Sequence, residues 1–206
     1  MSLVFTQDEM NTITFISNSN LSNGEKWSST QLLAIKRKIK DYYLRIGTSR
    51  CCYCKRNLLA EFNMVIDIEH ILPKEAFPQY MFTIENLNVS CKKCNMKIKG
   101  SNMDFIVNVN TITANFRLSN QYYFIHPNFD DYFSNMKYYV KIKNDKTFTK
   151  YKPITPKGKY SYDYFKLNEF EVNDFNSLQG IKDQFNNMMG NLGAQYDRLV
   201  DLLKRV

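Results

Sequence analysis

The sequence lacks any run of about 18 apolar residues, so we expect no membrane-spanning helix and no membrane partner. Its start, MSLVFTQDEM, has no basic first segment, no long apolar stretch and no small-residue cleavage site. Secretion through a cleaved signal is therefore not expected, and we predict a cytoplasmic protein. The chain also lacks an internal repeat and any recognisable helix-turn-helix. If the protein binds nucleic acid, we therefore expect weak or no sequence specificity.

What is present is a core-forming composition with an excess of positive charge. Of 206 residues, 44% are hydrophobic and 15% aromatic, which is enough for one packed domain with an appended segment. The formal net charge is +8 at pH 7. A balance this basic favours a polyanionic partner. Nucleic acid is the partner that we expect, and a membrane surface is the second class that such a charge would suit.

The N-terminal part is expected to be a polar lead-in followed by a helix. Residues 1–27 are rich in Asn, Ser and Thr, and we predict a loose segment with a short strand at 12–16. Ser28 and Ser29 are candidate N-caps, and Gly47 is a candidate helix end. Apolar residues recur between them at helical spacing, namely Leu32, Ile35, Ile39, Tyr42 or Tyr43, and Ile46.

The rest of the chain alternates strand and helix patterns, which predicts an α+β fold. We expect strands at 64–71, 86–90 and 122–127, a short helix within 91–99, a hairpin at 136–155 that turns at Asn144-Asp145, and helices from about 160 to 206. We divide the chain into a lead-in at 1–27, a central domain at 28–118 and an α/β extension at 119–206.

Five cysteines carry the clearest chemical signal. Four form two C-x-x-C pairs, Cys51 with Cys54 and Cys91 with Cys94. Two such turns supply four thiolates, the closed tetrahedral set of a structural Zn²⁺ site. A disulfide framework does not suit an odd cysteine count in the cytoplasm, and a redox C-x-x-C would need a βαβ setting that is absent. The spacing favours Cys51 over Cys52 as the ligand.

The segment between the two pairs resembles the HNH endonucleases, the ββα-metal family. The matching stretches are EHILPK at 69–74, ENLNVSC at 85–91 and CKKCN at 91–95. The resemblance covers residues 51–100. It implies a ββα-metal core braced by the four-cysteine zinc, with phosphodiester hydrolysis as the activity.

The resemblance also assigns roles. His70 suits a general base, because the pKa of an imidazole lies near the working pH. By resemblance Glu69 and Asn95 bind a catalytic divalent ion, and their oxygen donors suit Mg²⁺ or Mn²⁺. Asn86 holds the loop and helps to orient His70. Asp67 is a rival acid, but it lies outside the adjacent acid-His pair, so we favour Glu69.

Basic residues around this segment are expected to contact the DNA backbone. Lys36 and Arg37 lie on the basic face of the predicted helix. The segment after Asn95 is one residue longer than the commonest family form, so the phosphate-contacting lysine is either Lys97 or Lys99. The lysines of the hairpin are further candidates. The alternative is that these basic faces are merely solvated.

A looser likeness extends beyond the central segment. HPNFDDY at 126–132 and SYDYFKLN at 161–168 resemble HNH subunits of Septu-type bacterial anti-phage systems. That resemblance implies a defence effector that acts with an ABC-type ATPase. For His126 itself we favour a structural or capping role over a role in a site.

The leading functional hypothesis is thus a metal-dependent HNH endonuclease that cuts DNA. One alternative is a non-catalytic zinc module that binds nucleic acid or protein. Another keeps the enzyme and changes the substrate to RNA, because the site would read a phosphodiester rather than a sugar or a base.

Overall fold

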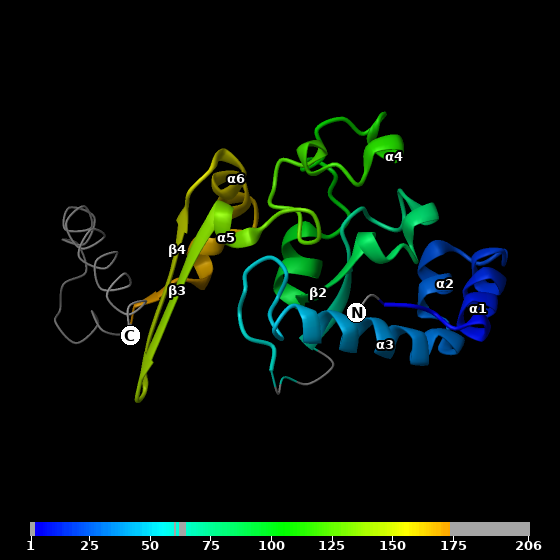
Figure 1. Cartoon of the computed structure of the whole chain (residues 1–206), viewed down its shortest axis with the longest axis horizontal. Helices are drawn as coiled ribbons and strands as arrows, with labels where there is room; N and C mark the ends of the chain where they lie inside the picture. Colours follow the sequence, from blue (N-terminus) through cyan, green and yellow to red (C-terminus); the bar gives the residue numbers. More distant parts are fainter. Residues whose placement is uncertain (1–2, 60, 62–64, 174–206) are drawn as a thin grey trace. The chain divides into compact units, whose positions relative to one another are not determined.

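The computed structural model describes residues 3–59, 61 and 65–173 (Figure 1). The chain divides into two compact units. The described part of the larger unit runs to Tyr138 and continues from Tyr151 to Phe170, and the described part of the smaller unit holds Tyr139–Lys150 and residues 171–173. The predicted segments 1–27, 28–118 and 119–206 do not coincide with these units and stay a prediction about domain boundaries.

The N-terminal part is helical, so the predicted loose lead-in with a strand at 12–16 is wrong. Two helices are present, α1 (Gln7–Ser17) and α2 (Asn23–Ser28). Each begins with a capping box, in which the N-cap side chain and an acid three residues later bind each other's backbone N–H. The two boxes pair Thr6 with Glu9 and Ser22 with Glu25. These boxes satisfy the free amide groups that otherwise oppose short helices.

The predicted basic helix is confirmed. A 3-10 turn, η1 (Thr30–Leu32), is capped by the Ser29 hydroxyl and leads into α3 (Leu33–Ile46). Gly47 follows the last helical residue, as expected. The predicted apolar face is largely buried, with Leu32, Ile35, Ile39 and Tyr43 in the core, whereas Ile46 is half exposed.

A strand pair and a short helix form the centre of the larger unit. Strands β1 (Ile66–His70) and β2 (Leu87–Cys91) pair antiparallel, with Ile66 opposite Cys91 and His70 opposite Leu87. Both match the predicted strands. A π-helical segment, η5 (Lys93–Lys99), follows β2 and ends at Gly100, as predicted; this glycine has a φ of 52°. A left-handed φ suits glycine because it lacks a Cβ. Helix α3 packs against both strands.

The predicted strand at 122–127 is wrong, because this segment is fixed by ring packing rather than by a ladder. Only an isolated bridge joins Tyr122 to Ile106. The fully buried Phe124 stacks on Phe105, with 4.5 Å between ring centroids. The larger unit also holds short helices, namely η3 (Pro78–Tyr80), η4 (Ile84–Asn86), α4 (Ile112–Asn115), η6 (Ser119–Gln121), α5 (Tyr132–Asn135), α6 (Pro156–Tyr164) and η7 (Leu167–Phe170).

The predicted hairpin is confirmed. Strands β3 (Met136–Lys143) and β4 (Lys146–Pro153) are joined by Asn144 and Asp145, and Asn144 adopts a φ of 55°. Asparagine tolerates this left-handed conformation better than most residues. The two-residue β5 (Val172–Asn173) pairs with β4, which completes a three-stranded sheet.

The described structure therefore mixes helix and sheet, as the α+β prediction requires. Part of the predicted C-terminal helical region is present as α6, and the predicted helices at 174–206 lie outside the described residues. None of the described helices combines the length and the apolar character needed to cross a membrane.

Candidate metal centre and catalytic pocket

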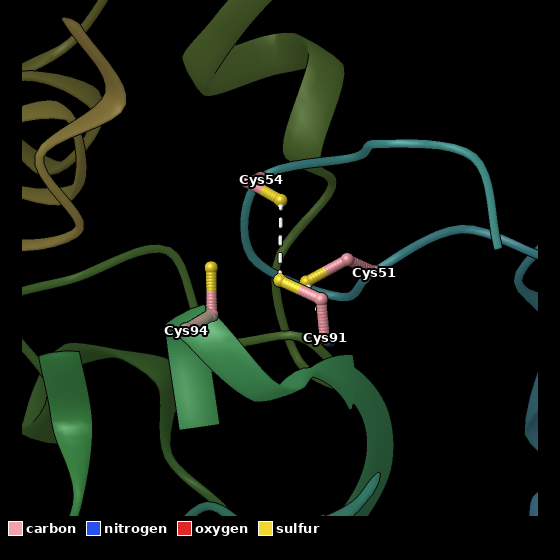
Figure 2. A group of neighbouring side chains, drawn as sticks. All are labelled: Cys51, Cys54, Cys91 and Cys94. Carbon is pink, nitrogen blue, oxygen red and sulfur yellow. Dashed lines mark hydrogen bonds between the residues drawn. The ribbon is translucent and has the colours of Figure 1, made fainter. Parts of the chain in front are cut away.

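Four buried cysteines form a cluster suited to a metal ion. Cys51 and Cys54 come from a tight turn before β1, Cys91 ends β2 and Cys94 lies in η5. Their sulfurs all lie within 4.8 Å of one another, and the Cys54 and Cys91 sulfurs are 3.9 Å apart (Figure 2). Four sulfurs about 2.3 Å from a central ion would lie about 3.8 Å apart, so the set fits a tetrahedral site.

The cluster contains Cys51 rather than Cys52, in line with the choice that the spacing favours. Cys52 lies outside the cluster of four, although it is also buried. Burial raises the pKa of the Cys52 thiol well above its usual value, which keeps it protonated. The four clustered cysteines are thus positioned to bind a metal ion, consistent with structural zinc, and Cys52 is a small packed residue.

A second feature is an open pocket of about 450 Å³ beside β1 and η5. It brings together Asp67 and His70 from β1 and Asn95 from η5. The Asn95 amide nitrogen donates to an Asp67 carboxylate oxygen at 3.3 Å. The other lining residues are Trp27, Ile68, Pro73, Lys74, Glu75, Met96, Gly100 and Ser101.

The ring of His70 is held in one tautomer. Its Nε2 atom lies 3.0 Å from the Met81 carbonyl oxygen, which can only accept. Nε2 of the neutral ring therefore carries the proton, and Nδ1 is left as an acceptor. Burial lowers the pKa of His70 to about 3, so the ring is neutral at pH 7. A neutral imidazole has a lone pair that can accept a proton, although a pKa this low makes the ring a weaker base than one that titrates near pH 7.

Glu69 occupies a different environment from the one expected of an exposed metal ligand. It has no exposed surface, and its Oε1 atom binds the Lys99 ammonium at 2.8 Å and accepts from the Tyr53 hydroxyl at 3.0 Å. Its Oε2 atom is buried without a hydrogen-bond partner among the described residues. Burial raises the pKa of Glu69, and the Lys99 charge opposes that shift.

The preference for Glu69 over Asp67 as the metal ligand stays a prediction, but the two acids lie in different surroundings. Asp67, not Glu69, lines the pocket with His70 and Asn95. The physical reason is the placement of η5, which sets Asn95 beside Asp67 and Lys99 beside Glu69.

Asn86 braces the loop rather than lining the pocket. Its side chain is 1% exposed and bonds to backbone groups only. The amide oxygen accepts from the Leu72 N–H at 2.7 Å, and the amide nitrogen donates to the carbonyls of Leu72 and Tyr80, both at 3.1 Å. These bonds fix the segment that ends next to Met81, whose carbonyl orients His70.

Among the four basic residues expected to contact DNA, Lys99 does not fit. It is 1% exposed, and its ammonium bonds to Glu69 and to the His70 carbonyl at 2.9 Å. Lys97 is exposed and is the better phosphate candidate. Arg37 is also exposed, whereas the Lys36 ammonium donates to the Trp27 carbonyl at 3.0 Å.

His126 has the environment expected of a structural residue. It is 1% exposed, its Nδ1 accepts from the Asn128 N–H at 3.2 Å, and its ring stacks on Phe129 with 4.2 Å between centroids. Burial lowers the pKa of His126 to about 3.

Sequence reasoning missed two contributors to this region. Trp27 lines the pocket from α2, and Tyr53 binds Glu69 from between the cysteines. The signal for Trp27 was its rarity, because it is the chain's single tryptophan. Tyr53 had no signal beyond its place within a C-x-x-C turn.

Comparison with known proteins gives one local similarity. No family model matches the chain. A segment of 62 residues is 37% identical to "Septu protein PtuB" of Bacillus thuringiensis, and it covers 30% of this chain. The match spans 24% of that relative's length, about a quarter. The chain is thus weakly and locally similar to a Septu protein. It also has four cysteines that are positioned to bind a metal ion.

Proposed function

We propose that this protein is a metal-dependent endonuclease that hydrolyses phosphodiester bonds in DNA. The observation that carries the proposal is the pocket in which Asp67, His70 and Asn95 converge. Support also comes from the resemblance of residues 51–100 to the HNH endonucleases and from the net charge of +8.

The donor set of this pocket fits a hard divalent cation such as Mg²⁺ or Mn²⁺. Asp67 offers a carboxylate and Asn95 a neutral amide oxygen, the donors that such ions take. The Asn95 amide would turn so that its oxygen, rather than its nitrogen, faces the ion. When bound, the ion stabilises charge that develops on the phosphate and on the leaving oxygen.

His70 acts as the general base in this proposal. Its Nδ1 takes a proton from a water molecule, whose oxygen forms a bond to phosphorus while the bond to the leaving oxygen breaks. The leaving oxygen is protonated from solvent, and the imidazolium returns its proton to solvent. The carbonyl of Met81 keeps the ring in the required tautomer throughout.

Other residues position the pocket or the substrate. The Lys99–Glu69 pair holds η5 against β1, and Asn86 holds the loop. Lys74, which lines the pocket, and the exposed Lys97 are suited to contact phosphates. The four-cysteine zinc braces both ends of the site and takes no part in the chemistry.

The test is a cleavage assay on supercoiled plasmid and on RNA of similar length. The zinc-loaded protein is incubated with Mg²⁺, with Mn²⁺ or with EDTA. The proposal expects plasmid nicking or linearisation with either ion and none with EDTA. Cleavage of RNA alone would assign the rival substrate. No cleavage of either polymer by folded protein would leave a binding module as the function.

We extend the proposal to a role in anti-phage defence. Its support is the resemblance to HNH subunits of Septu-type systems and the local similarity to a Septu protein. That resemblance implies an ABC-type ATPase as a partner. Purification of the tagged chain from its native operon should recover such an ATPase, and recovery of the chain without it would argue against the partner.

A further inference from the structure

The single tryptophan of the chain lies against the proposed base. Trp27 belongs to α2, and its ring meets the His70 ring edge-on, with 4.4 Å between centroids and 78° between planes. Aromatic pairs favour this geometry. Trp27 also lines the pocket beside Asp67 and Asn95. Helix α2 thus supplies part of the wall of the site.

Trp27 is itself held from several sides. The ammonium of Lys36 donates to the Trp27 carbonyl at 3.0 Å and lies 5.6 Å from the centre of its ring. The Phe82 ring is 5.8 Å away, from the segment that also carries Met81. The capping box of α2 fixes the start of the helix. These contacts hold the indole of Trp27 in one orientation against His70.

One hydrogen bond does not fully orient an imidazole. The Met81 carbonyl fixes the position of Nε2, but the ring can still tilt about that bond. Contact with the indole removes this freedom, because a tilted ring would collide with it. A base must point its lone pair at the attacking water, so small tilts lower the rate.

We propose that Trp27 is a positioning residue for His70, and that α2 is therefore part of the catalytic site. This inference rests on the proposed nuclease function, which it deepens. Trp27 itself exchanges no proton; it acts by holding the acceptor nitrogen in place.

The first test is independent of activity. The chain has two histidines, so their ring nitrogens give a simple NMR spectrum, with His126 as an internal control. In the wild type we expect His70 as the Nε2–H tautomer with ring protons shifted by the indole. Trp27→Ala should remove that shift and broaden the His70 ring signals, because the ring can then tilt about its bond to the Met81 carbonyl, whereas the tautomer and the His126 signals stay unchanged. An unaltered line shape for His70 would overturn the inference.

The second test measures cleavage kinetics. Trp27→Ala should lower kcat by about 10- to 100-fold with KM within about twofold, since orientation and not binding is lost. Trp27→Phe should restore most of the rate and also covers the case in which the alanine variant fails to fold. Phe15→Ala, an exposed aromatic on α1, is the matched control and should behave as wild type.

The outcomes separate the inference from the proposed function. A wild type that cleaves, with Trp27→Ala at the same kcat, refutes the role of Trp27 and leaves the nuclease intact. A wild type that never cleaves refutes the nuclease, whereas the NMR comparison still decides whether Trp27 orients His70.

Discussion

Two acids on one strand illustrate how environment decides chemical role. Asp67 and Glu69 are two positions apart on β1, so alternation sends both to the same face of the sheet. Asp67 meets the Asn95 amide in an open pocket, whereas Glu69 meets the Lys99 ammonium in the core. Glu69 is fully buried with its Oε1 atom paired to a cation, whereas Asp67 lines the open pocket.

The first prediction separates these two acids. Asp67→Asn should lower metal-dependent cleavage by roughly 10- to 100-fold and raise the Mn²⁺ concentration needed, as expected for loss of a metal-site group. Glu69→Gln should chiefly lower stability. Cleavage against Mn²⁺ concentration, with thermal unfolding in parallel, gives both quantities. An active Asp67→Asn beside an inactive but stable Glu69→Gln would return the ligand role to Glu69.

The second prediction concerns the pH dependence of stability at His126. The pKa of His126 is about 3 in the folded protein and about 6.5 in the unfolded chain. Between about pH 6.5 and pH 3, the unfolded chain therefore binds a proton at His126 and the folded protein does not. The free energy of unfolding should therefore drop by up to roughly 1.4 kcal/mol per pH unit from this residue. His126→Asn keeps an acceptor for the Asn128 N–H. This variant should lose the part of the pH dependence of unfolding free energy that comes from His126.

Urea unfolding between pH 7 and pH 5 measures the difference between wild type and His126→Asn. Protonation of the zinc thiolates affects both proteins alike and cancels in the comparison. Parallel stability curves for the two proteins would show that His126 is not buried as a neutral ring.

At the scale of elements, the segment η5 links the metal cluster to the pocket. It carries Cys94 into the cluster, Asn95 to the pocket and Lys99 to the buried pair with Glu69. A second ion pair joins its start to η7, between Lys93 and Glu169 at 3.0 Å. Lys93 and Glu169 are partly exposed, so their pair adds little stability. The buried pair is the stronger constraint on where η5 lies.

The third prediction tests that constraint. Lys99→Met leaves the Glu69 carboxylate buried without its cation, which should cost about 3–5 kcal/mol of unfolding free energy. The double variant Lys99→Met, Glu69→Leu removes both charges and should be more stable than Lys99→Met alone. Chemical denaturation of the two singles and the double measures the coupling. Additive effects in the double would mean that the pair does not act as a unit.

The central elements follow from local patterns, and so they were predictable. Strands β1 and β2, the helix α3 and the hairpin all have clear apolar periodicity or turn residues. Helix α1 was mistaken for a strand at 12–16 because the β-branched residues there favour strands, while its capping box at Thr6 decides for helix. The segment at 122–127 has strand-like residues, but Phe124 buries its ring in an aromatic cluster instead of pairing.

The site was predictable to the extent that spacing defines it. The four cysteines and the pocket positions of His70 and Asn95 follow from motif order. The sequence left the phosphate contact open between Lys97 and Lys99, because spacing does not show that Lys99 is buried in the folded chain. Trp27 was missed for the same reason, since its contact with His70 joins residues 43 positions apart.

For the whole molecule, the four-cysteine cluster ties together two segments separated by 36 residues, with β1 and its loop between them. Metal bound at such a cluster contributes directly to folding. An ion bound by this cluster would help to fix the position of Asn95 in the pocket, because Cys94 and Asn95 are adjacent residues of η5.

The fourth prediction follows from that coupling. Cys94→Ser should lose the zinc and unfold at a lower temperature, whereas Cys52→Ser should keep one zinc per chain and a stability near that of wild type. Metal analysis by mass spectrometry and thermal unfolding are the measurements. Equal zinc content in the two variants would show that the ion is not held by the predicted four.

The central claim is that the pocket of Asp67, His70 and Asn95 is a phosphodiesterase site. The most direct measurement is single-turnover plasmid cleavage by His70→Ala beside His126→Asn, both zinc-loaded and folded. We expect the cleavage rate of His70→Ala to fall by about 100- to 10,000-fold, which is what a general base contributes to the rate of a reaction. His126→Asn should cleave at the wild-type rate. Equal rates for His70→Ala and wild type would contradict the claim.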